Sequence, residues 1–482
     1  VLYPKVYLAK QPAKSVDAMG GIISGKAIVS NTNADILNQG IMAADTIVLG
    51  ANAVQNTGRI DGRKVTIKAS QDVTNTGNIH GDKRVTINAG RDINVGTHVD
   101  KLENHDIVGR QGTIGVGEKG DLLLSAKRDV NLKGAIVHTG ENSKATIEAG
   151  QNINLTTEAL SSKKDMTVNS DNYNRTDRRT ELGTAILSDN NVTLRAGNDV
   201  NIRNGIVNSE HGLTTVEAGN NVNITNGKSY SRDEYGLKYK EKSLLSRTTN
   251  IIRTDHEHAG VLSSTIGGDT INVKANRNVS VTGSNILGTK DVSVAAGNDV
   301  RTDSGEDTQR DDVYQYSKKS GLMGAGIGFT IGSKKVTDTT DGRYKNQVAT
   351  NISSSKDEIN VSAGNSIHST TTNYFSNKPI DLSAQNVTVD GKHNTAHVQS
   401  HEEKRSGLTV SVGGQIVNEL NAVQQLGKRA NSRKNSNLST LEYLEAANTL
   451  KHAYNDAKAY SKIKPVNLLD KEREVLRKAN EL

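Results

Sequence analysis

The sequence predicts a parallel β-helix, a solenoid in which each coil of about 20 residues lies on the coil before it. Three observations lead to this fold class: an eleven-residue pattern that returns along the chain, apolar residues that alternate within it, and a polar corner in its middle. The pattern is clearest at Val85–Val95, VTINAGRDINV. The composition agrees, because a thin stacked core needs few large side chains, and the chain has two Phe and no Trp.

Each copy of the pattern can be aligned on an alanine. The residues two and four places before this alanine are mostly Val, Ile or Leu, as at Val85 and Ile87. This period of two indicates a strand with one buried face. The apolar pattern resumes four places after the alanine, as at Ile93, so a second short strand follows a corner. The aligned alanines are Ala69, Ala89, Ala126, Ala149, Ala196, Ala218, Ala275, Ala296, Ala363 and Ala384.

The distances between these alanines separate the β-helix from other repeat folds. They are 20, 37, 23, 47, 22, 57, 21, 67 and 21 residues, so every second gap is enlarged by an insertion. A β-propeller would show a Trp-Asp signature, and a leucine-rich repeat would show a Leu-x-x-Leu-x-Leu frame. Neither is present. We expect the insertions as loops or hairpins on one face, near residues 97–120, 157–190, 226–269, 302–357 and 389–412.

The corner is usually Gly, a polar residue and then Asp or Asn, as in Gly197-Asn198-Asp199. These residue types tolerate left-handed backbone angles and cap turns with their own side chains. In a stack, an unbroken column of acids would place like charges within about 5 Å of one another, which is unfavourable. Asparagines interrupt the acids here, and we predict a structural corner column. Its members are Asp72, Asp92, Asp129, Asn152, Asp199, Asn221, Asn278 and Asp299.

The two ends of the chain differ from the repeats. Residues 1–20 are expected to be an entry or linker segment, and the coils are expected over residues 21–413. Residues 414–482 are expected to be helical, because Ser439-Thr-Leu-Glu442 is a capping box and Pro465 would end a helix. This segment either caps the last coil or leads towards a downstream module. With no initiator Met and no signal peptide, the chain reads as a piece of a longer protein.

The sequence offers little for catalysis or for ligand binding. Lys and Arg exceed Asp and Glu by 60 − 53 = 7, but they are scattered, which favours a solvated surface over nucleic-acid binding. The absence of cysteine excludes disulfides and thiol chemistry. His256-Glu-His258 has no third metal ligand in view, and no phosphate-binding loop or Ser-His-Asp frame is present. We therefore expect no catalytic residue, cofactor, metal, nucleic acid or small-molecule substrate.

The glycine-rich run Gly321–Gly332 could interact with a membrane. Its length is close to the 9 to 11 residues of a membrane β-strand. Lys318, Lys319, Lys334 and Lys335 flank it, as anchors to lipid head groups would. A glycine-rich hairpin folded on the stack is the alternative. The candidate membrane-active residues are Gly321, Leu322, Met323, Ile327, Phe329 and Ile331.

The repeats resemble a known family. Asn-Thr-Gly-x-Ile corners, as at residues 56–60, are followed by Ala-Gly-x-Asp-Val/Ile repeats. Over residues 20–400 this pattern of corners and repeats resembles the haemagglutinin repeats of filamentous-haemagglutinin-like exoproteins, which form right-handed β-helices. Tyr316–Gly332, its echo at Glu403–Gly413 and the switch to a helical segment resemble the late repeat block of CdiA-type contact-dependent growth-inhibition effectors.

The resemblance implies a secreted protein on the surface of a Gram-negative bacterium, exported through the outer-membrane transporter of two-partner secretion. A segment of this kind would help to present and translocate a C-terminal toxin into a neighbouring bacterium, at whose surface or outer membrane it would act. A surface adhesin without toxin is the alternative. A polysaccharide-cleaving β-helix is a more distant one, because it needs paired carboxylates about 5 to 9.5 Å apart. Enzymatic activity is expected only in a toxin domain downstream.

Overall fold

The computed structural model describes residues 21–243, 246–324 and 329–404. These belong to the first of two units, residues 1–405 and 406–482. All elements of the described part are β-strands, and the coils wind as a right-handed parallel β-helix, so the predicted fold class is confirmed. The expected entry segment 1–20 and helical segment 414–482 lie outside the described residues.

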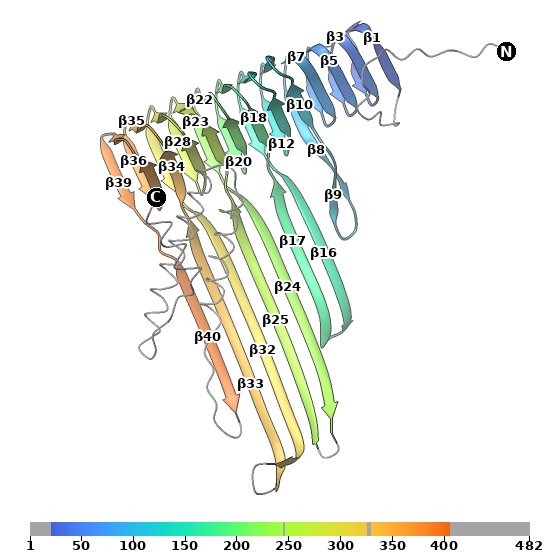
Figure 1. The fold of residues 1–482 in the computed structure, drawn as a ribbon, viewed down its shortest axis with the longest axis vertical. Helices are drawn as coiled ribbons and strands as arrows, with labels where there is room; N and C mark the ends of the chain where they lie inside the picture. The colour runs from blue at the N-terminus through green and yellow to red at the C-terminus, as the bar shows by residue number, and fades with distance from the viewer. Residues whose placement is uncertain (1–20, 244–245, 325–328, 405–482) are drawn as a thin grey trace, which may run out of the picture. The chain divides into compact units, whose positions relative to one another are not determined.

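Two parallel sheets run the length of the solenoid (Figure 1). Each coil adds to the larger, 20-stranded sheet either one long strand or two short strands. Neighbouring strands belong to successive coils, so residues one coil apart are partners, as Ile67 and Ile87 are. The strands of this sheet are β1 (Ile22–Asn31), β3 (Ile41–Ala51), β5 (Arg59–Ala69), β7 (Asn78–Ala89), β10 (Thr113–Val116), β11 (Asp121–Ala126), β13 (Ile136–Thr139), β14 (Lys144–Ala149), β18 (Ala185–Ser188), β19 (Val192–Ala196), β21 (Ile206–Ser209), β22 (Leu213–Ala218), β26 (Thr265–Gly268), β27 (Thr270–Ala275), β29 (Asn285–Gly288), β30 (Val292–Ala296), β34 (Thr350–Ser354), β35 (Ile359–Ala363), β37 (Thr372–Ser376) and β38 (Ile380–Ser383).

The second sheet has 13 strands and takes the short strand that follows each corner. Its strands stack in parallel, except that β9 turns back on β8 as an antiparallel hairpin. The strands are β2 (Ile36–Asn38), β4 (Val54–Asn56), β6 (Val73–Asn75), β8 (Ile93–Lys101), β9 (Asp106–Gln111), β12 (Val130–Lys133), β15 (Ile153–Thr156), β20 (Val200–Arg203), β23 (Asn221–Thr225), β28 (Asn278–Thr282), β31 (Asp299–Asp303), β36 (Ser366–Thr370) and β39 (Asn386–Asp390).

The core is a set of aliphatic columns between these two sheets. Ile87, Leu124, Ile147 and Leu194 are partners in successive coils and are all 0% exposed. Val294 continues the same inward-facing position and is also 0% exposed. Burial of each such side chain is worth roughly 1.5 to 3 kcal/mol. The period-two columns that the sequence predicts therefore line the interior of the solenoid.

A buried asparagine ladder stabilises the first coils. The Nδ2 atom of Asn38 donates to Oδ1 of Asn56 at 2.7 Å, and Nδ2 of Asn56 donates to Oδ1 of Asn75 at 2.7 Å. Asn56 and Asn75 are 0% exposed. These amides occupy the Asn-x-Gly corners, and each one satisfies the next inside the stack.

The corner glycines correct one expectation. Among the described residues, the glycines with positive φ are Gly134 and Gly283, so corner glycines such as Gly197 are not left-handed. They are required by the close approach of the coils instead. A Cβ on Gly197 would lie 2.2 Å from the carbonyl oxygen of Gly150 in the coil below, far inside van der Waals contact.

The third sheet is antiparallel, has seven strands and extends to one side of the solenoid (Figure 1). Its strands come from the inserted stretches, and they lengthen along the chain from β16 to β33. We call this sheet the wing. Its strands, in spatial order, are β16 (Glu158–Asn169), β17 (Asn172–Leu182), β24 (Gly227–Lys242), β25 (Ser246–Leu262), β32 (Gly305–Gly324), β33 (Phe329–Val348) and β40 (Thr395–Lys404).

The spacing of the coils explains why separate hairpins form one sheet. The strands of the wing follow β15, β23, β31 and β39, which are alternate strands of the 13-stranded sheet. Coils and neighbouring strands share a spacing of about 4.8 Å, so two coils rise by about the width of one two-stranded hairpin. Successive hairpins therefore arrive side by side, and β17 pairs with β24, β25 with β32 and β33 with β40.

Candidate functional site

The predicted corner column forms a continuous hydrogen-bonded ladder between coils. In most steps a side-chain oxygen accepts a backbone N–H from the same position of the next coil, whereas between Asn221 and Asn278 the side-chain Nδ2 of Asn278 donates to Oδ1 of Asn221 at 3.1 Å. Oδ1 of Asp129 accepts the N–H of Asn152 at 3.0 Å, and Oδ1 of Asp199 accepts the N–H of Asn221 at 2.9 Å. At the far end, Oδ1 of Asp299 accepts the N–H of Ser366 at 3.1 Å. These oxygens are occupied in holding coils together.

Arginines separate the acids where the column has no asparagine. Arg91 forms an ion pair with Asp72, and Arg128 forms an ion pair with Asp92. The hydrogen bond from Arg91 lowers the pKa of the Asp72 carboxyl, so this acid stays ionised. The column thus tolerates consecutive acids because a cation lies beside each contact. The asparagines of the column were predictable from the sequence, whereas these arginines, which stand immediately before the corner acids Asp92 and Asp129, were not recognised as their neighbours' partners.

The candidate membrane-active residues lie at the distal end of the wing. The backbones of Gly321, Leu322 and Met323 belong to β32, and those of Phe329 and Ile331 belong to β33. Leu322 is paired with Ile331, so the run forms the end of one hairpin. Ile327 lies outside the described residues.

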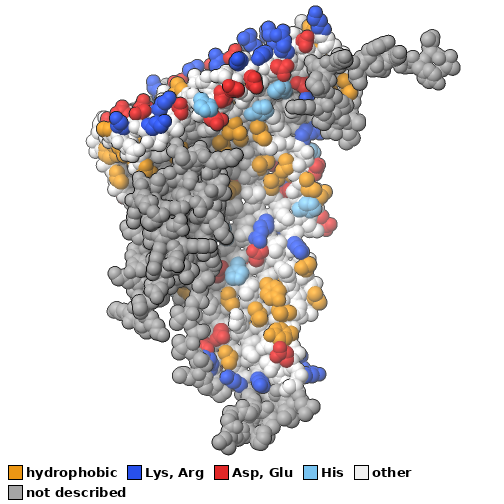
Figure 2. Space-filling model, in the orientation of Figure 1, with side chains coloured by type: hydrophobic (Ala, Val, Ile, Leu, Met, Phe, Trp, Pro, Cys, Tyr) orange, Lys and Arg blue, Asp and Glu red, His pale blue; other side chains and the backbone are white. Residues whose placement is uncertain are grey.

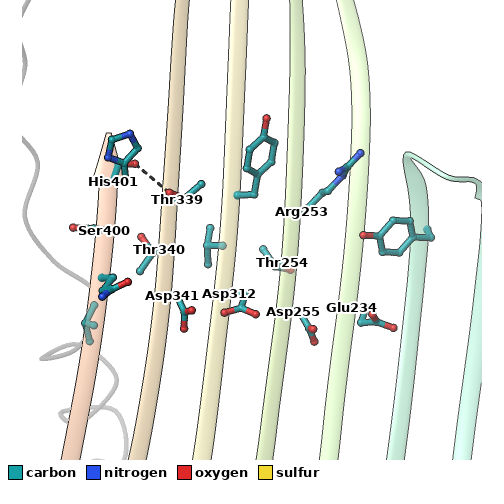
Figure 3. Close-up of a pocket in the computed structure, with 15 residues that line it drawn as sticks. Glu234, Arg253, Thr254, Asp255, Asp312, Thr339, Thr340, Asp341, Ser400 and His401 are labelled. Atoms are coloured by element: carbon teal, nitrogen blue, oxygen red, sulfur yellow. Dashed lines mark hydrogen bonds between the residues drawn. The ribbon is translucent and has the colours of Figure 1, made fainter. Parts of the chain in front are cut away.

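A shallow trough of about 870 Å³ crosses one face of the wing. One side of it is a row of acids on four adjacent strands, namely Glu234, Asp255, Asp312 and Asp341 (Figure 3). Each acid is directly opposite the next in the strand register. The other side of the trough carries Tyr173, Arg253, Tyr314, Thr339 and His401.

The acid row is paired with arginines that lie two residues from Glu234, Asp312 and Asp341 on the same strands, and Arg232 of β24 also reaches Asp255 of β25. Arg232 contacts Glu234 at 3.0 Å and Asp255 at 2.8 Å. Arg310 pairs with Asp312, and Arg343 pairs with Asp341 at 3.2 Å. Rows of like charge would weaken the sheet, and the neighbouring arginine row offsets that cost.

The chemistry of the trough is that of an ion-pair network. The hydrogen bond from Arg232 lowers the pKa of Asp255. A glycosidase needs one carboxyl whose pKa is raised so that it can act as an acid. In the trough every acid of the row has an arginine within ion-pair distance.

The histidines of β25 are engaged by acids on the face of the wing opposite the trough. Nδ1 of His256 lies 2.9 Å from Oδ1 of Asp311, and Nε2 of His258 lies 3.9 Å from Asp307. Burial raises the pKa of Asp307. His256 and His258 therefore each face a different carboxylate across the strand pair, and they do not converge on one point.

One three-residue group within the described ranges has the spacing of metal ligands, and the sequence analysis missed it. Ligand atoms of Asp189, Glu210 and His211 lie within 4.8 Å of one another. Nδ1 of His211 is 3.0 Å from Oδ1 of Asp189, which raises the pKa of His211. The three residues come from neighbouring coils, so only the stacking register brings them together.

Within the described ranges, none of the elements is a helix with the length and hydropathy needed to cross a membrane. The surface of the solenoid carries alternating basic and acidic side chains, whereas the face of the wing in Figure 2 shows scattered apolar side chains and basic groups at its distal end. In the described part of the chain, the organised polar groups are the hydrogen-bonded ladders between coils, the acid and arginine rows of the wing, and the basic groups at the distal end of the wing.

Comparison with known proteins gives a consistent family. A family model described as Hemagglutinin repeat matches residues 165–239 and 250–345, and each matched segment begins and ends in a strand of the wing. The chain is 30% identical over 416 residues to a tRNA nuclease CdiA of Escherichia coli, which is 80% of this chain and 12% of that protein. No solved structure matches.

Two further relatives extend the comparison. A tRNA nuclease CdiA of Burkholderia pseudomallei is 26% identical over 347 residues, 70% of this chain and 27% of that protein. A 16S rRNA endonuclease CdiA of Enterobacter cloacae is 28% identical over 271 residues, 55% of this chain and 8% of that protein. The chain thus spans a small part of each of these relatives. Together with the fold, the matches identify it as a haemagglutinin-repeat region of the CdiA type, within the filamentous-haemagglutinin-like family.

Proposed function

We propose that this chain is the delivery segment of a contact-dependent growth-inhibition effector. It would be exported through the outer-membrane transporter of two-partner secretion and displayed on the surface of a Gram-negative cell. From there it would help to carry a C-terminal toxin to the outer membrane of a neighbouring bacterium. The candidate membrane-active run, Gly321–Ile331, would contact that membrane.

One observation carries this proposal: both segments that match the repeat family begin and end in the wing. The wing gains one hairpin every two coils, and its strands can pair only at that period. The regular placement of the insertions is therefore a property of the fold and not a chance result of separate loops. A plain adhesin stalk would need the solenoid alone.

The relatives support a carrier role for the repeats. The names of these relatives differ in the RNA that is cut, a tRNA in one case and 16S rRNA in the other. Both nevertheless share this repeat region. The region therefore fits a part that is common to effectors with different toxins.

Deleting one hairpin in the full-length effector tests the proposal. The variant lacks residues 306–347, which form the hairpin of β32 and β33. The control lacks residues 98–110 of the β8–β9 hairpin, which is not a strand pair of the seven-stranded sheet and forms one β-bridge to its edge strand β16, from His105 to Ser162. Surface display, binding to target cells and growth inhibition of targets are measured for each.

The expected result is that the β32–β33 variant is displayed and binds target cells normally but no longer inhibits them, whereas the control inhibits them. The adhesin alternative predicts a different result, in which binding to target cells is lost together with the hairpin. Full inhibition by the β32–β33 variant would contradict a delivery role for the wing.

A further inference from the structure

The distal end of the wing carries lysines that lie opposite one another on neighbouring strands. Lys318 is directly opposite Lys335, and Lys319 is directly opposite Lys334, so two consecutive cross-strand pairs of β32 and β33 are both cationic. Like charges in this position destabilise a sheet. Lys335 has an acidic partner in Glu403, but Lys319 and Lys334 form no ion pair with a described residue, so their repulsion is a cost of this hairpin end that a bound anion would offset.

The next hairpin brings further cations to the same place. Lys318 is opposite Thr249 of β25, and Thr249 is opposite Lys240 of β24. Two rows further along the strands, Arg247 is opposite Lys242. The register therefore joins cations from two hairpin ends that are far apart in the sequence. We define the basic collar as Lys240, Lys242, Arg247, Lys318, Lys319 and Lys334.

The basic collar is exposed and poorly neutralised. All six side chains are exposed, and none forms an ion pair with another described residue. By contrast, the adjacent Lys335 pairs with Glu403 at 3.4 Å. Glu241 is the one acid on the strand segments that carry the collar, residues 240–242, 247–249, 318–320 and 334–335. In the acid row nearer the solenoid, by contrast, each acid has an arginine partner and the charges compensate one another.

We infer that the basic collar binds a phosphate-bearing lipid surface. Its cations project from both faces of the wing, since Lys318 and Lys319 are consecutive strand residues. When the end of the wing meets a lipid surface, the head-group phosphates can contact the basic collar on both faces of the sheet. Each Lys or Arg near an anionic membrane contributes about fivefold to binding, which follows from about 1 kcal/mol per residue. By sequence, the chain between the two halves of the collar includes Leu322, Met323 and Phe329, which suits contact with lipid.

This inference rests on the proposed delivery role for its biological setting, but its test uses the purified full chain alone. Binding is measured by co-sedimentation with vesicles of phosphatidylcholine and with vesicles containing about one third phosphatidylglycerol, at low and high salt. The collar variant is Lys318→Gln with Lys319→Gln and Lys334→Gln. The control is Lys64→Gln with Lys68→Gln and Lys274→Gln, which removes the same charge from exposed positions on the coils.

The wild type and the control are expected to bind the anionic vesicles and not the neutral ones, and high salt should weaken this binding. The collar variant lacks three lysines and should bind about a hundredfold more weakly, at about fivefold for each. Because the substitutions relieve repulsion, circular dichroism should show an unchanged fold.

Equal binding by the collar variant and the control would overturn the inference, as would equal binding to neutral and anionic vesicles. Tighter binding of a single-stranded oligonucleotide than of anionic vesicles would replace the lipid with a nucleic acid. Failure of the hairpin deletion to affect growth inhibition would remove the delivery role but would leave the vesicle result intact, so the two tests fail separately.

Discussion

At the scale of single residues, the molecule depends on side chains that repeat with the coil. Asn56 is one of these, because it both donates and accepts a hydrogen bond within the buried ladder. A polar group inside a dry stack is stabilising only while its neighbours remain. The contribution of each ladder residue to stability therefore depends on its hydrogen-bond partners in the coils above and below it.

Asn56→Ala is therefore expected to destabilise the solenoid by about 2 to 4 kcal/mol, because it leaves a buried donor on Asn38 and a buried acceptor on Asn75 without their partner. Urea unfolding followed by circular dichroism measures the change. The control is Asn88→Ala on the outward-facing side of β7, for which we expect a change within about 0.5 kcal/mol. Similar losses for the two variants would show that the ladder adds nothing.

The titration of His211 offers a second test at this scale. The hydrogen bond to Asp189 raises the pKa of His211 above its ordinary value of 6.5. A raised pKa in the folded state means that the stabilising contribution is complete below the unfolded value and is lost as pH rises through the folded value. NMR titration of the imidazole should show the raised pKa, and Asp189→Asn should return it towards 6.5. An identical titration in the variant would contradict this pairing.

The residue scale also shows what the sequence could and could not reveal. Ile87, Ile147 and Leu194 were predictable as core because alternation within a strand fixes which face is buried. Arg91 and Arg128 were not recognised as partners of the corner acids, since only the stacking of one coil on another places an arginine beside the previous acid. Left-handed corners were wrongly expected, because glycine serves close approach as well as positive φ.

At the scale of elements, the glycine at each corner sets how closely two coils can lie. Gly197→Ala is expected to destabilise the β-helix by about 1 to 3 kcal/mol, because the new Cβ would meet the Gly150 carbonyl and the coils would have to separate. Thermal unfolding measures this. Gly96→Ala is the control, since its Cβ would lie 3.9 Å from the nearest atom, an ordinary contact. Equal melting temperatures for both variants would argue against close approach as the reason for glycine.

The wing was only half predictable at this scale. Alternation of short and long gaps between the alanines indicated an insertion in every second coil, and hairpins on one face were expected. Their union into one sheet was not, because it depends on the rise of the coils, which a period in residues does not state. The sequence does place one insertion in every two coils, and two coils and one hairpin have equal widths, so the information needed to predict the union was present. The acid row and the basic collar both follow from that union.

At the scale of the whole molecule, the solenoid and the wing share one repeat of two coils. A deletion that respects this repeat should be tolerated. Removing residues 198–276 takes out two coils with the β24–β25 hairpin, and it leaves β17 next to β32. We expect the shortened protein to fold with intact β-structure and to unfold in a single transition.

The comparison is with removal of residues 198–219, which takes out one coil and no hairpin. Here β17 and β24 would start one coil apart in place of two, so the wing and the solenoid could not both keep their spacing. A lower melting temperature and a separate early transition are expected for this variant. If both deletions behaved alike, the shared repeat would have no energetic meaning.

The pairing of one hairpin with two coils also bears on how such a protein changes during evolution. Among the coils that carry wing hairpins, duplication or loss of a gene fragment leaves the solenoid and the wing intact only when an even number of turns is gained or lost. Lineages of these exoproteins should therefore differ in length by whole two-turn modules, each with its own arm, and odd-numbered intermediates should be selected against.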